Sequence, residues 1–196
     1  MTAYFKVSRF ALNLSAALAL GVLALGPSSA ASTAKWKIDP ARTHIAFAID
    51  AVGYPRTEGQ FRRFDGRVSV DFDHPGKSSV AFHVQSQSVD VGSSSFGDYL
   101  RSGAFLDAER FPTIDFVSNS VEKIDDHTVR VSGDLTLLGV TKPLTVNVAV
   151  RRENGPTRLG FLAKTSINRL DFGMTSGFPL VSRDVELVIS SEAAEL

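Results

Sequence analysis

The feature that most constrains the fold of this chain is an alternation of apolar and polar residues that recurs along most of its length. In residues 64–73 the even positions are apolar or small and the odd positions are polar, which is typical of a β-strand with one dry and one wet face. About eight segments follow this pattern. Their apolar positions are Ile45, Phe47 and Ile49; Phe64, Gly66, Val68, Val70 and Phe72; Val80, Phe82 and Val84; Ile114 and Phe116; Val129, Val131, Gly133, Leu135 and Leu137; Leu144, Val146, Val148 and Val150; Leu159, Phe161 and Ala163; and Val185, Leu187 and Ile189.

Short turns separate several of these segments, at His74-Pro75-Gly76, Asp125-Asp126 and Asn154-Gly155-Pro156. Short connections favour antiparallel hairpins over crossover units. Amphipathic strands that close on themselves bury one face and lose their exposed edges. We therefore predict an all-β fold, an eight-stranded antiparallel barrel. A two-sheet sandwich is the alternative, because alternation alone does not distinguish the two.

The apolar parity changes between Phe61 and Phe64, which predicts a bulge at Arg62-Arg63 where a long strand bends.

Two connections are longer than hairpin turns. In residues 86–112 the side chains of Phe96, Tyr99 and Leu100 have helical spacing, with Ser94 or Ser95 as N-cap and Gly103 as a stop, which predicts one short helix. Residues 168–183 are rich in apolar side chains, which is more typical of a lid than of a tail. Both connections are predicted to cover a mouth of the barrel.

Residues 1–30 have the pattern of a secretory signal peptide. Two basic residues precede an apolar run at residues 10–25, and a helix breaker and small residues follow it. The run is shorter than the roughly 20 apolar residues of a membrane-spanning helix. We expect cleavage after Ala30, with Ala34 as the alternative, and an exported domain of residues 31–196.

Charge and composition exclude several classes of function. Basic and acidic residues balance at 21 each, without a long basic block, so nucleic acid is not an expected partner. Cysteine is absent, which excludes disulfides, thiolate metal ligands and cysteine nucleophiles. The four histidines are far apart and lack metal-binding spacing. We therefore predict no metal site, no cofactor and no catalytic residue, and we do not expect an enzyme.

Several short motifs then occur in a particular order: Trp36-Lys37-Ile38-Asp39-Pro40, His44, Gly59-Gln60-Phe61, Phe64-Asp65-Gly66, Phe111-Pro112, Gly133-Asp134-Leu135-Thr136, Gly139-Val140-Thr141-Lys142-Pro143 and Arg169-Leu170-Asp171-Phe172-Gly173. Together they resemble the YceI-like periplasmic proteins. The resemblance implies a lipocalin-like, extended eight-stranded barrel with an elongated apolar pocket for a polyisoprenoid, a quinone-type lipid or another long-chain amphiphile. It also implies a periplasmic location. One departure is Ile45, where the family often has serine.

From the alternation and this resemblance we predict the residues that face the ligand. The apolar ones are Phe47, Phe64, Phe72, Phe82, Leu100, Phe105, Phe116, Leu135, Leu137, Phe161, Phe172 and Met174. A polar head group is expected to meet His44, Arg56 or Arg169 at the mouth. Small residues at strand positions either leave space for the ligand or match the taper of the barrel. They are Ala46, Ala48, Gly66, Ala81, Gly133, Gly160 and Ala163.

Alternatives stay open at this point. An enzyme that acts on a lipid would depend on a polar residue, with His44 as the first candidate. An outer-membrane barrel shares the alternation, but it needs aromatic girdles, and the acidic C-terminus has no terminal aromatic strand residue. We therefore expect no stable membrane insertion. The oligomeric state is undecided, with a homodimer among the possibilities.

Overall fold

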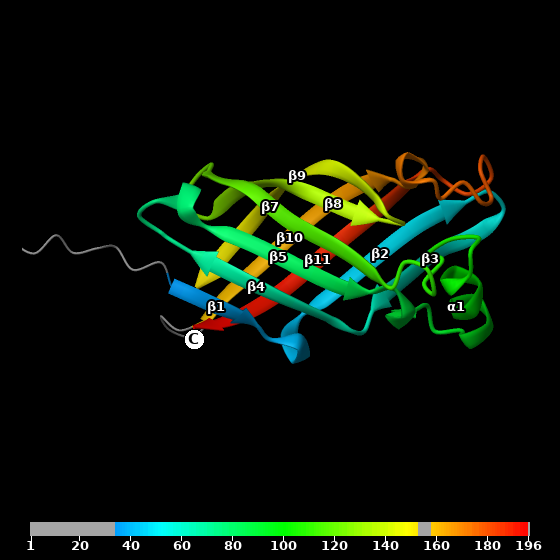
Figure 1. Cartoon of the computed structure of the whole chain (residues 1–196), viewed down its shortest axis with the longest axis horizontal. Helices are drawn as coiled ribbons and strands as arrows, with labels where there is room; N and C mark the ends of the chain where they lie inside the picture. The colour runs from blue at the N-terminus through cyan, green and yellow to red at the C-terminus, as the bar shows by residue number, and fades with distance from the viewer. Residues whose placement is uncertain (1–33, 153–157, 196) are drawn as a thin grey trace, which may run out of the picture. The chain divides into compact units, whose positions relative to one another are not determined.

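The computed structural model of the protein describes residues 34–152 and 158–195 (Figure 1). The predicted signal peptide and the predicted turn at Asn154-Gly155-Pro156 lie outside these residues. None of the helices in the described part is long and apolar enough to cross a membrane. The described elements are β1 (Ala34–Ile38), β2 (His44–Ala51), β3 (Tyr54–Phe61), β4 (Phe64–Val70), β5 (Ser79–Gln85), β6 (Val89–Asp90), α1 (Ser94–Arg101), β7 (Thr113–Lys123), β8 (Thr128–Leu137), β9 (Val140–Arg152), β10 (Arg158–Asn168) and β11 (Asp184–Glu195), with short 3-10 helices at Pro40–Arg42, Pro75–Lys77, Ser86–Ser88 and Arg169–Phe172.

The strands form a closed antiparallel barrel, as predicted. Eight of them follow one another in the order β1-β4-β5-β7-β8-β9-β10-β11, and β11 pairs back onto β1, where Trp36 lies opposite Glu195. This pairing closes the ring and excludes the two-sheet sandwich. The remaining strands β2, β3 and β6 extend the sheet from β11, where Ala48 lies opposite Glu186.

At Arg62-Arg63 the structure has a break between two strands, where a bulge within one long strand was predicted. The break separates β3, which ends at Phe61, from β4, which begins at Phe64. The interrupted backbone is still hydrogen-bonded there, because Arg62 N donates to Ser88 O at 3.0 Å and Gln85 N donates to Arg63 O at 2.9 Å. The chain therefore bends at this point without leaving its neighbours.

Helix α1 lies in the first long connection, as predicted, but its N-cap is Ser93 rather than Ser94 or Ser95. The Ser93 side chain accepts a hydrogen bond from Phe96 N, and the helix ends with Ser102 as C-cap. Any of the three serines can cap a helix. The choice depends on packing: in this register Leu100 is buried, whereas Phe96 and Tyr99 are largely exposed.

The two long connections lie at the same end of the barrel (Figure 1). Residues from both pack into one apolar cluster with the strands, and the cluster includes Leu100, Leu106, Leu137, Phe172 and Met174. We call this the closed end. The opposite end carries the shorter β4–β5 and β7–β8 connections, residues 71–78 and 124–127, and we call it the open end.

Candidate functional site

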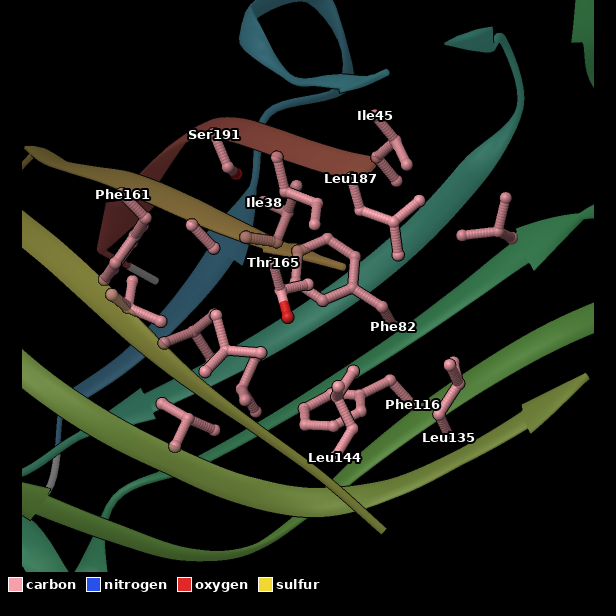
Figure 2. Close-up of a pocket in the computed structure, with 18 of the residues that line it drawn as sticks. Ile38, Ile45, Phe82, Phe116, Leu135, Leu144, Phe161, Thr165, Leu187 and Ser191 are labelled. Carbon is pink, nitrogen blue, oxygen red and sulfur yellow. The ribbon is translucent and has the colours of Figure 1, made fainter. Parts of the chain in front are cut away.

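The barrel encloses an apolar cavity of about 400 Å³ (Figure 2). Its walls are the inward faces of the strands, and the alternation read from the sequence places the lining residues there. On β9 the lining residues are Leu144, Val146, Val148 and Val150, which are every second residue, and the residues between them are exposed.

The degree of burial shows that the interior is hollow. An inward-facing side chain in a filled core is normally buried almost completely. Here the inward residues of β9 and β10, such as Val148 and Phe161, are only half-buried although they point into the barrel. Their free surface faces the cavity.

Two phenylalanine rings define the middle of this cavity. Phe82 on β5 and Phe116 on β7 are opposite each other in the strand register, and both line the cavity (Figure 2). A Cβ atom built on Gly66 would lie 3.0 Å from the Phe82 ring, and one on Gly133 would lie 2.8 Å from the Phe116 ring. These glycines accommodate rings that lie across the sheet, so their missing side chains do not themselves open the cavity.

Four of the other small residues differ in which face of the sheet they occupy. Ala163 lines the cavity and leaves space there. Ala46, Ala48 and Ala81 alternate with lining residues and are outside the lining, so they belong to the outer face.

The buried end of the cavity contains one charged side chain, Arg169, which is 0% exposed. Its Nε donates to Ser182 O at 2.7 Å, its Nη1 to Met174 O and Ser176 O, and its Nη2 to Val181 O at 3.0 Å. Desolvation by burial lowers the pKa of the guanidinium below its ordinary value. Arg169 therefore fastens the connection before β11 over the closed end, and most of its donors are already used.

The cavity reaches the surface at the opposite end of the barrel. Phe72, which is 48% exposed, belongs to its lining there, as do Lys123 and Asp126, whose side chains are largely exposed. At the closed end the lining residues Leu100, Leu106 and Met174 are buried. The mouth is therefore at the open end, and the two long connections close the other end.

Of the twelve apolar residues predicted to face a ligand, ten line the cavity. They are Phe47, Phe72, Phe82, Leu100, Phe105, Phe116, Leu135, Leu137, Phe161 and Met174. Phe64 and Phe172 are not in the lining. Phe64 packs against the cluster at the closed end and against a second buried cluster, which contains Trp36, Ile38 and Leu159. Phe172 is buried in the cluster at the closed end.

The three polar residues predicted for a head group do not meet at the mouth. His44 is exposed on β2 and outside the lining. Arg56 on β3 is also outside it and forms salt bridges with Asp50 at 2.9 Å and Glu186 at 2.6 Å, which raise the pKa of its guanidinium. Arg169 lies at the buried end. The error has a physical cause, because periodicity places residues on a face of the sheet but does not say which end of the barrel is open.

One rim residue was missed by the sequence reasoning. Arg152, the last residue of β9, has the same parity as the lining residues Val148 and Val150. Its guanidinium carbon lies 4.8 Å from the centre of the Phe72 ring. Continuing the alternation of this strand by one more step would have identified it.

Other chemistry in the described part of the chain is sparse. No group of three His, Asp or Glu residues that could hold a metal ion is found in residues 34–152 and 158–195. His83 Nδ1 lies 2.6 Å from Asp115 Oδ1 on the exposed face, and Thr113 donates to the other oxygen of the same carboxylate. The threonine hydroxyl thus contacts the carboxylate and not the imidazole, so this trio lacks the nucleophile–base contact of a catalytic triad.

Sequence comparison relates the chain to one family. The sequence model of the YceI-like domain matches residues 36–193. The protein YceI of Salmonella arizonae is 34% identical over 174 residues, which cover 86% of this chain and 91% of that protein.

Two solved structures have the same fold. BcnA of Burkholderia cenocepacia aligns with a TM-score of 0.75 at 24% identity, covering 80% of this chain and 99% of that one. A polyisoprenoid binding domain from Saccharophagus degradans aligns with a TM-score of 0.69 at 15% identity, covering 84% of this chain and all of that one. At such low identity the two likenesses establish the barrel fold alone.

Proposed function

This chain belongs to the YceI-like family, and from that premise we propose that it binds a polyisoprenoid or a related long-chain amphiphile in the cavity of its barrel, without catalysing a reaction. The observation that carries the proposal is the hollow apolar interior, with lining residues from all around the ring of strands. The solved neighbour that is a polyisoprenoid binding domain supports the same class of ligand.

The lining explains how an apolar tail would be held. Removing apolar surface from water contributes about 25 cal/mol per Å², before the cost of ordering the ligand. Because side chains such as Val148 and Phe161 keep free surface toward the cavity, a tail would bury ligand and protein surface together. The ten lining residues predicted from the sequence are the proposed tail contacts.

The proposal is tested on protein purified without detergent, by native mass spectrometry and organic extraction. The wild type should release a long-chain compound. Phe116→Asp and Phe82→Asp place a charge inside the apolar cavity, where its desolvation is costly, and should abolish the lipid load. Val148→Phe should lower the amount of bound lipid, because the larger side chain fills part of the cavity. This variant tests the proposal even if the aspartate variants fail to fold.

Val117→Asp is the matched control. Val117 neighbours Phe116 on β7 but is 49% exposed and outside the lining, so the same charge there should leave the load unchanged. Wild-type protein that carries no lipid and takes up none from vesicles would contradict the proposed function.

We also propose that the protein works in the periplasm. The support is the signal-peptide pattern of residues 1–30, which precede the matched range of residues 36–193. Osmotic shock of the producing bacterium should release a form that lacks the first 30 residues. A full-length protein that stays in the cytoplasmic fraction would refute this location.

A further inference from the structure

A contact between Arg152 and Phe72 spans the mouth of the cavity. Phe72 follows β4, and Arg152 ends β9. In the closed ring these strands are diametrically opposite, with β5, β7 and β8 between them on one side and β1, β11 and β10 on the other. The contact therefore joins opposite walls of the barrel.

Both residues are placed there by the alternation of their strands. Phe72 has the parity of the lining residues Val68 and Val70, and Arg152 has the parity of Val148 and Val150. Each is therefore the outermost described member of an inward-facing series. The guanidinium lies over the aromatic ring, in the geometry of a cation–π contact.

The other charged groups of the mouth already have polar partners. Lys123 forms a salt bridge with Asp126 at 2.6 Å, and Asp125 accepts a hydrogen bond from His127 N at 2.8 Å. Asp71 accepts hydrogen bonds from the backbone N–H groups of residues 73 and 74, although its Oδ2 has no hydrogen-bond partner.

Arg152 differs from these groups. Its guanidinium carbon lies 4.8 Å from the centre of an aromatic ring, that of Phe72. Arg152 is exposed, and a contact with the face of an aromatic ring does not itself use the N–H donors of a guanidinium.

We propose that Arg152 binds the head group of an amphiphile with an anionic head, a carboxylate or a phosphate, while Phe72 packs against the first carbons of the tail. This inference rests on the proposed function. A guanidinium is suited to the task because its planar fork donates two parallel hydrogen bonds to an oxyanion. The Phe72 ring holds the guanidinium of Arg152 over the mouth. When the amphiphile binds, its oxyanion becomes the main partner of this guanidinium in place of the ring.

The test compares head groups on one tail. Geranylgeranyl phosphate, geranylgeraniol and geranylgeranylamine are titrated into the delipidated mature protein. A second series compares palmitate with hexadecanol, so that a preference for a carboxylate can be told from a preference for a phosphate. Wild-type protein should bind the anionic member of each set roughly tenfold more tightly than the alcohol, the size of one charge-assisted hydrogen-bonded contact. High salt should reduce this preference, because the mouth is exposed.

Arg152→Gln should remove the preference for the anion and leave binding of the alcohol unchanged, whereas Arg152→Lys should restore part of it. Arg130→Gln is the control, because Arg130 is exposed on the neighbouring strand β8, pairs with Glu122 and alternates with the lining residues Val129 and Val131, so it is on the outer face. Its affinities should equal those of the wild type.

Two results would overturn the inference and leave the proposed function intact. The first is equal affinity of the wild-type protein for all head groups. The second is tighter binding of the amine, which would mean that the carboxylates at the rim determine the selectivity. If no member of either set binds the wild type, the proposed function itself fails.

Discussion

The closed end and the open end of the barrel each contain an arginine, and the two arginines are used in opposite ways. At the closed end Arg169 is wholly buried and donates to four backbone carbonyls of the connection before β11. At the open end Arg152 is exposed and lies over the Phe72 ring. One arginine holds a connection in place, and the other is the proposed contact of the ligand head group.

The apolar residues differ between the ends in the same way. Around Arg169 the strands and both long connections pack into a dense cluster. Beyond this cluster the inward residues of β9 are only half-buried and face the cavity. A second buried cluster, formed by Trp36, Ile38, Val68, Leu159 and Ala193, packs where β1, β4, β10 and β11 meet, so tight packing is not confined to the closed end.

The largest expected effect comes from removing the buried arginine. Arg169→Met should lower the free energy of unfolding by about 4 kcal/mol, because four carbonyls lose a charged donor and stay buried. Arg152→Gln should change it by less than about 0.5 kcal/mol, as is usual for an exposed side chain. Urea unfolding of both variants measures the difference. Equal destabilisation would contradict the contrast between the two ends.

A second comparison uses leucines on neighbouring strands. Leu137 on β8 and Leu144 on β9 both line the cavity, but Leu137 is 5% exposed and buried in the cluster at the closed end, whereas Leu144 is only half-buried. Leu137→Ala should cost about 3 kcal/mol, because it leaves a void in a packed cluster. Leu144→Ala should lower the free energy of unfolding by about 1 kcal/mol, because it enlarges an existing cavity. Similar costs in urea unfolding would mean that the interior is filled at Leu144 as well.

The smallest effect is a pH dependence at the open end. Backbone hydrogen bonds, the strongest from His74 N, lower the pKa of Asp71 below its ordinary value of 3.8. A carboxyl group whose pKa is lowered in the folded state stabilises the protein at pH values above the ordinary pKa of that group. This contribution is lost as the pH falls from the ordinary pKa through the lowered one. Asp71→Asn should therefore be less stable than the wild type at pH 7, and the difference should shrink below about pH 4. A difference that stays constant down to about pH 3 would show that the charge of Asp71 has no part in it.

The sequence by itself determined the wall of the cavity. Alternation with a period of two is a local property, since successive side chains of a strand point to opposite faces. It therefore placed residues such as Phe82, Phe116 and Leu135 on the inner face without knowledge of the neighbouring strands. The change of parity between Phe61 and Phe64 is also visible in the chain itself, and it marks the break between β3 and β4.

Only the tertiary structure decided what lies at each end. Arg169 and Arg152 are both arginines near the ends of strands, and nothing local distinguishes the buried one from the exposed one. The difference arises from contacts between segments far apart in the chain: the late connection folds over Arg169, and residue 152 meets a ring eighty positions earlier. Side-chain parity is set by the geometry of one strand, whereas the open end of a barrel is set by the paths of the connections, which depend on the packing of the whole domain.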